Sequence, residues 1–151
     1  MSDLNFKITA QRESKAKTVV KARDFEIIID EPKGLGGTDT AANPVEYVLA
    51  ALAGCLNVMG HIIAKEMNFE LRDLKIEMEG NLNPTKLFGK GDEERAGYKN
   101  IKVKMMPESD APEETLQKWL HSIEERCPVC DNLRHTTDVE VELGAYAGAE
   151  A

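Results

Sequence analysis

The sequence predicts an α+β fold in a single domain covering residues 1–151. Three observations lead to this prediction. The N-terminal part holds three short strand-like segments, residues 45–67 hold the longest helical pattern, and the remainder holds two strands, a second helix and a last strand. A chain of 151 residues is the size of one ordinary domain and is long enough to bury a hydrophobic core.

The N-terminal strands are expected at residues 4–13, 15–21 and 25–30, with a tight turn at residues 22–24. The first segment alternates loosely between apolar and polar side chains. The third contains Ile27, Ile28 and Ile29, and β-branched residues favour strands. Pro32 and the glycines that follow it end the regular structure, so a loop is expected as far as Ala42.

The long helix is expected to begin at Asn43-Pro44, because Asn caps helices well and Pro is favoured at the first helical position. Cys55 lies three residues after Leu52 and four before Met59, which places it on the apolar face as a buried or half-buried thiol. Apolar residues also cover more than this one face. We therefore expect the helix to be buried on nearly all sides.

The second half of the chain is expected to hold strands at residues 71–79 and 101–105, separated by an exposed loop at residues 83–97. A second helix is expected to begin at Pro112, after Ser109, and to end near Cys127-Pro128, because Pro disfavours helix in the residue before it. A last strand is expected at residues 138–143.

Composition and charge exclude several classes of function. The net charge of −8 is unfavourable for binding nucleic acid or an anionic membrane, both of which attract clustered Lys and Arg. No uninterrupted apolar run reaches about 18 residues, so no membrane span is expected, and the first residues lack the pattern of a signal peptide. An odd number of cysteines, three, does not suit a secreted disulfide scaffold. We therefore expect a cytoplasmic protein.

The cysteines allow several interpretations when the residues are considered alone. Cys55 on an apolar face is commonly just a small, inert core residue. The C-x-x-C formed by Cys127 and Cys130 indicates a redox pair or half of a zinc site, completed by His135 and by Cys55 or His61. Because this motif follows a predicted helix, it is expected near the negative end of that helix, which is unfavourable for a thioredoxin-type thiolate.

Residues 43–55 (NPVEYVLAALAGC) resemble the helix-start signature of the OsmC/Ohr superfamily, the osmotically inducible and organic hydroperoxide resistance proteins. Cys127-Pro128-Val129 is similar to the second cysteine motif of the superfamily, and residues 32–37 resemble the loop before its signature. The resemblance covers essentially the whole chain. It implies an OsmC-like fold, with antiparallel sheets around a long central helix, and an intertwined homodimer.

The resemblance also implies a thiol peroxidase that acts in oxidative stress defence. Cys55 would reduce an organic hydroperoxide, or hydrogen peroxide, and become a sulfenic acid, and Cys127 would condense with it to a disulfide. An external dithiol of the lipoyl type would reduce the disulfide, with no bound cofactor and no metal. In Ohr-like members a glutamate and an arginine activate the first thiol, and the nearest matches here are Glu46 and Arg12.

The sequence departs from the superfamily pattern in three places. The strict Ohr signature has glutamate at the position of Val45, one residue before Glu46, and one residue turns a helical side chain by about 100°. Arg23 is an alternative to Arg12 as the activating arginine. Cys130 stands where many relatives have Ser. These departures leave two alternatives to a peroxidase, which are a ligand-binding protein of the same fold without enzyme activity and a zinc-binding protein.

Overall fold

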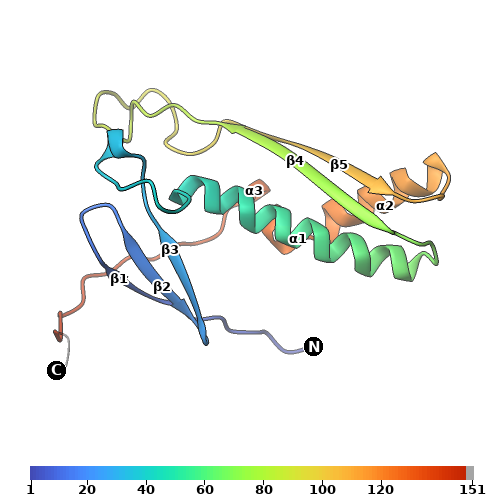
Figure 1. Ribbon diagram of the computed structural model, residues 1–151, viewed down its shortest axis with the longest axis horizontal. Helices are drawn as coiled ribbons and strands as arrows, with labels where there is room; N and C mark the ends of the chain where they lie inside the picture. Colours follow the sequence, from blue (N-terminus) through green and yellow to red (C-terminus); the bar gives the residue numbers. More distant parts are fainter. Residues whose placement is uncertain (149–151) are drawn as a thin grey trace.

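The computed structural model describes residues 1–148, so the last three residues of the expected domain, 149–151, lie outside the described part. It confirms a mixed α+β fold with two antiparallel sheets (Figure 1). The elements in chain order are β1 (Thr9–Arg12), β2 (Thr18–Ala22), β3 (Phe25–Ile29), the short 3-10 helix η1 (Lys33–Leu35), α1 (Pro44–Glu66), β4 (Asp73–Asn81), β5 (Asn100–Glu108), α2 (Glu113–Arg126) and α3 (Pro128–Arg134).

The first three strands form one sheet in the order β1-β2-β3, and Val20 of β2 faces Ile27 of β3. The tight turn between β2 and β3 is present, and Arg23 adopts a positive φ of 56° in it. β1 is shorter than predicted. The apolar residues before it, Leu4, Phe6 and Ile8, are exposed, so alternation alone did not place them in the sheet.

The loop after β3 is built around one fully buried carboxylate. Asp30 Oδ2 accepts hydrogen bonds from Thr38 Oγ1 at 2.6 Å and from the backbone N–H of Thr40 at 3.1 Å. These hydrogen bonds hold the pKa of Asp30 well below its usual range, against the opposing effect of burial. At the same place the Asp30 N–H donates to Ala42 O, which closes the loop directly before α1.

The helix α1 begins where the sequence predicts. Asn43 Oδ1 accepts from the N–H of Glu46 at 2.9 Å, and Glu46 Oε2 accepts from the N–H of Asn43 at 2.8 Å, which together form a capping box. Pro44 occupies the first turn. The capping box fixes the direction in which the chain enters the long helix.

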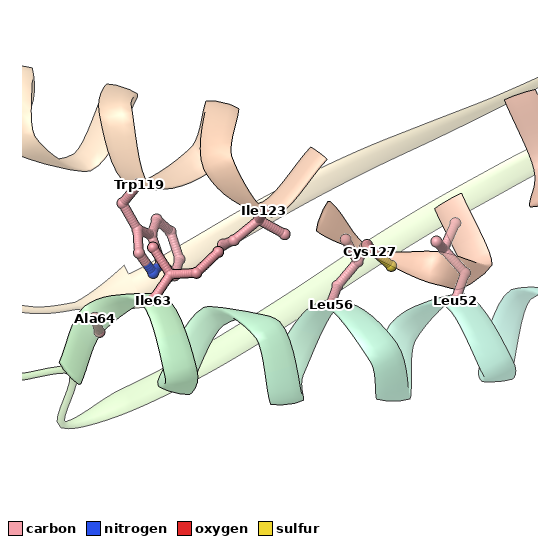
Figure 2. Close-up of a cluster of buried hydrophobic side chains, with 7 residues drawn as sticks. All are labelled: Leu52, Leu56, Ile63, Ala64, Trp119, Ile123 and Cys127. Atoms are coloured by element: carbon pink, nitrogen blue, oxygen red, sulfur yellow. The ribbon is translucent and has the colours of Figure 1, made fainter. Parts of the chain in front are cut away.

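The core lies between one face of α1, the helix α2 and the β4–β5 sheet. Figure 2 shows Trp119 and Ile123 of α2 pointing toward Ile63 and Leu56 of α1. The Trp119 Nε1–H donates to Gly60 O at 2.7 Å, so the buried indole is satisfied. Half-buried residues of β4 and β5 complete this core: Leu74, Ile76, Met78, Ile101 and Met105.

The opposite face of α1 is open in the single chain. The exposed fractions of Val48, Val58 and Ile62 are 37%, 55% and 43%. The expectation that the helix is buried on nearly all sides is therefore not met within one chain. By length and composition α1 is also apolar enough to cross a membrane, a property that the core helix of a globular protein can share. It packs, however, on β4, α2 and α3 as the core helix of this fold.

The C-terminal part differs from the prediction in two places. Residues 138–143 do not form a strand, and their apolar side chains Val139, Val141 and Leu143 are exposed. A strand needs a neighbouring strand edge to pair with, and none is hydrogen-bonded to this segment in the described part of the chain. The helix α3, directly after α2, was not predicted, because Pro128 was taken only as a helix end and not also as a helix start.

Candidate functional site

Two cysteines from distant parts of the chain meet in the core. Cys55 lies on α1, and Cys127 lies in the bend between α2 and α3. The Cys127 thiol donates to Cys55 Sγ with 3.0 Å between the sulfurs, and both thiols are free. The fold thus places in contact two residues that are 72 positions apart in the sequence.

The bend at Cys127 has a local cause. Pro128 forces the residue before it out of the helical conformation, so Cys127 adopts φ −75° and ψ 112° and ends α2. Just before the bend, Arg126 makes a two-pronged ion pair with Glu66 at the end of α1, with Nη2 and Oε1 2.9 Å apart. This pair, together with Trp119 on Gly60, sets the position of α2 along α1.

The environment of Cys127 favours its neutral form. Its side chain is fully buried, as Figure 2 shows between α1 and α3. Burial first, and then the hydrogen bond with Cys55, raise the pKa of the Cys127 thiol from 9.0 to about 11. The Cys130 N–H, which donates to Cys127 Sγ at 3.4 Å, opposes this rise. Cys127 is therefore a proton donor toward the sulfur of Cys55.

Cys55 is half-buried and packs against the apolar core beside Met59. It is therefore the more accessible member of the pair, and it accepts a hydrogen bond from the thiol of Cys127. The arrangement allows chemistry at Cys55 with a second thiol already in contact.

Cys127 joins two helices. It is the C-cap of α2, so the C-x-x-C begins at the negative end of that helix, as the sequence predicts. It is also the N-cap of α3, with Cys130 in the first turn, and this second helix start at Pro128 was not predicted.

A cavity of about 420 Å³ is lined by Cys130, the third cysteine. Its apolar wall comes from α1, β5 and α3, and two guanidinium groups, those of Arg95 and Arg134, also line it. A smaller cavity of about 200 Å³ shares Cys130 and Arg134 with the first. The residues with apolar side chains in the larger cavity are Val45, Val48, Leu52, Ile101, Val103 and Leu133.

The two candidate activators lie elsewhere. The Glu46 carboxylate is engaged in the capping box. Burial raises the pKa of Tyr98, and the negative charge of Glu46 adds to that rise. Arg12 is exposed in β1, and the alternative Arg23 stacks on the Phe25 ring at 4.9 Å. The described contacts within one chain bring neither Glu46 nor Arg12 to the sulfur of Cys55.

Arg134 is a residue of this region that the sequence analysis missed. It pairs with Glu124 at 2.7 Å, and this hydrogen bond, followed by the charge of a Cys130 thiolate, raises the pKa of Arg134. Arg134 follows Cys130 by four residues, which is one helical turn. Recognising Pro128 as a helix start would have placed Arg134 one turn after Cys130 on the same face of α3.

The two histidines considered for zinc have other partners in the structure. His135 Nδ1 lies 2.9 Å from Asp131 Oδ1, and His61 Nδ1 lies 2.9 Å from Asn57 O on the exposed side of α1. Among residues 1–148 no group of three His, Cys, Asp or Glu side chains is arranged to hold a metal ion.

Comparison with known proteins identifies the fold. The model of the family described as OsmC-like protein matches residues 37–142. An OsmC-like protein from Mycoplasma pneumoniae is similar in structure, with a TM-score of 0.76 and 21% identity over 89% of this chain and 91% of that one. An organic hydroperoxide resistance protein from Elizabethkingia anophelis has a TM-score of 0.65 and 19% identity over 89% and 91% of the two chains.

An organic hydroperoxide resistance protein from Legionella pneumophila has a TM-score of 0.64 and 20% identity, over 93% of this chain and 96% of that one. These identities support the likeness of fold only. No curated protein matches the sequence.

Proposed function

The chain belongs to the OsmC-like protein family, and on this premise we propose that it is a cysteine-based hydroperoxide reductase that acts in oxidative stress defence. The observation that carries the proposal is the contact between the sulfurs of Cys55 and Cys127, 3.0 Å apart, with Cys127 buried and protonated. Organic hydroperoxide resistance proteins among the structural neighbours support the substrate class.

In the proposed reaction the Cys55 thiolate attacks the terminal oxygen of the hydroperoxide, an S–O bond forms, the O–O bond breaks, and the departing alkoxide takes a proton from solvent to become the alcohol. Cys55 becomes a sulfenic acid. The Cys127 sulfur then attacks the Cys55 sulfur, and the hydroxyl group leaves as water with the Cys127 proton. An external dithiol reduces the resulting disulfide, so no bound cofactor takes part.

The structure supports this division of roles between the cysteines. A fully buried thiol with a pKa of about 11 is a poor nucleophile toward peroxide in solution, but it is well placed to condense with a neighbouring sulfenic acid. Cys55 is the more accessible of the two. The apolar side chains Val45, Leu52 and Met59 on its helix favour organic hydroperoxides over hydrogen peroxide.

We further propose that the protein acts as a homodimer. In the dimer Arg12, and Glu46 once released from its cap, reach Cys55 either from the partner subunit or after a rearrangement within the chain. The exposed apolar face of α1 and the unpaired segment 138–143 are surfaces that a second copy would cover. Light scattering after size exclusion should give twice the mass of one chain. Val58→Glu should give the monomer, whereas Leu87→Glu, at an exposed loop position, should not.

The assignment of the nucleophile is tested by substitution. Cys55→Ser should abolish peroxide consumption in the presence of a dithiol. Cys127→Ser should leave one sulfenic acid per chain, detected by mass spectrometry after one equivalent of cumene hydroperoxide. His121→Asn, at an exposed position of α2, is the control and should behave as wild type. Activity retained by Cys55→Ser would refute the mechanism.

A second candidate function is the binding of a small apolar ligand without turnover, which the cavity of about 420 Å³ favours. Peroxide consumption with a dithiol separates the two candidates, because a binding protein would not turn over. A zinc-binding protein is tested by metal analysis after purification without chelator.

A further inference from the structure

The backbone of the third cysteine contacts the sulfur of Cys127. The Cys130 N–H donates to Cys127 Sγ at 3.4 Å, and the two residues are the N-cap and a first-turn position of α3. In helical geometry, residues three apart have Cα atoms roughly 5 Å from each other, which lies within the range that a disulfide spans. Cys127 is thus within bonding reach of two thiols, Cys55 on one side and Cys130 on the other.

The three sulfurs differ in how an external reductant reaches them. Cys127 is fully buried, whereas Cys55 and Cys130 are both half-buried and pack against the core. Cys130 also lines both the cavity of about 420 Å³ and the smaller one of about 200 Å³, and Cys55 lines neither. Because thiol–disulfide exchange requires the incoming thiol to reach a sulfur directly, Cys130 is the best placed of the three for attack from the cavity.

A positive charge accompanies Cys130 in these cavities. Arg134 lines both of them, one helical turn after Cys130. In thiol–disulfide exchange the thiolate is the attacking species and also the leaving group, so negative charge develops on sulfur beside this cation.

We propose that Cys130 is a third redox residue, which takes over the disulfide from Cys55 and presents it to the reductant in the cavity. The Cys130 thiolate attacks Cys127 Sγ, the Cys127–Cys130 bond forms, and the Cys55–Cys127 bond breaks. Cys55 leaves as a thiolate, so the step is an isomerisation that needs no oxidant or reductant. The external dithiol then reduces the Cys127–Cys130 bond.

This inference rests on the proposed peroxidase function, and the experiment separates the two. Reduced protein is mixed with one equivalent of cumene hydroperoxide, quenched with acid at intervals, alkylated and mapped by peptide mass spectrometry. In wild type the Cys55–Cys127 bond should form first and give way to Cys127–Cys130 before any dithiol is added, while Cys55 becomes alkylatable again. A Cys55–Cys127 bond that persists until dithiol is added would overturn the proposal.

Cys130→Ser should form the Cys55–Cys127 bond and keep it, and dihydrolipoic acid should reduce that bond roughly tenfold or more slowly than it reduces oxidised wild type. Equal reduction rates would overturn the relay. Arg134→Ala should slow the transfer but not the first disulfide, and Arg134→Lys should restore it.

Cys55→Ser provides the matched control for direct oxidation. If it forms Cys127–Cys130 as fast as wild type, the C-x-x-C is oxidised independently and the relay is wrong. If the Cys130→Ser protein neither consumes peroxide nor forms Cys55–Cys127, the proposed peroxidase function itself fails.

Discussion

The raised pKa of Cys127 makes its reactivity quantitatively predictable. At pH 7 a thiol with a pKa of about 11 is ionised in roughly one molecule in 10⁴, whereas the ordinary value of 9.0 gives roughly one in 10². Native Cys127 should therefore react with iodoacetamide about 100-fold more slowly than an accessible, ordinary thiol from this effect alone. Full burial of the side chain slows the reaction further.

Replacing Cys55 should separate the two causes of the raised Cys127 pKa, which are burial and the hydrogen bond with Cys55. Cys55→Ala removes the hydrogen bond to Cys127 but leaves burial, the larger cause, so the pKa of Cys127 should fall from about 11 and stay above 9.0. Cys130→Ala is the matched control, because it removes a sulfur but keeps the backbone N–H that donates to Cys127.

The assay is pulsed alkylation of native protein, followed by peptide mass spectrometry. The wild-type rate at Cys127 should rise about tenfold per pH unit between pH 7 and 9 without a plateau, because the thiolate fraction grows in that proportion. Protein unfolded in urea gives the reference rate. A plateau below pH 9, or native Cys127 reacting as fast as Cys55, would refute the assignment of Cys127 as the buried, protonated partner.

Three further predictions concern stability. Because folding raises the pKa of Cys127, the contribution of its thiol to the free energy of unfolding is fully present below pH 9 and is lost as the pH rises toward about 11. The urea midpoint should therefore fall over that interval, and a midpoint that stays constant would contradict the raised pKa. The Asp30 pKa is lowered, so Asp30→Asn should lower the melting temperature at pH 7, and the difference from wild type should narrow as the pH falls below 3.8. Thr38→Val should reproduce part of that loss, and an Asp30→Asn protein as stable as wild type at pH 7 would refute the role of the carboxylate. Gly60→Ala would place a Cβ 3.1 Å from Trp119 Cζ2, so the gain of about 1 kcal/mol in helix propensity should be outweighed by overpacking of about 1–3 kcal/mol, giving a net loss in urea denaturation; a stabilised variant would show that the indole can shift.

Local signals predicted the elements that depend on local chemistry. The start of α1 follows from Asn43 and Pro44, whose capping geometry needs only neighbouring residues. The end of α2 at Cys127 follows from the steric effect of Pro128 in the same way. The contact between Cys55 and Cys127 required more than this, because the packing of two helices brings them together, and the family resemblance supplied that information.

The wrong expectations have physical causes that the sequence does not show. Residues 138–143 carry the alternation of a strand, but pairing depends on an available strand edge and not on the segment itself. The role of Glu46 at Cys55 stays a prediction, and within the single chain the capping box engages its carboxylate. Arg134 was missed because it lies on the same face as Cys130 only when residues 128–134 form a helix, and α3 was not predicted.

The loop around Asp30 makes the junction between the N-terminal sheet and α1 a stiff joint rather than a hinge. The Asp30 carboxylate accepts hydrogen bonds from the Thr38 hydroxyl and the Thr40 N–H. The Tyr47 Oη–H donates to Ile28 O in β3 at 2.6 Å. The two attachments lie on either side of the start of α1, so the sheet and the helix should tilt together. Slow hydrogen exchange at the amides of Thr38 and Thr40, unusual for a loop, would be the signature of that rigidity.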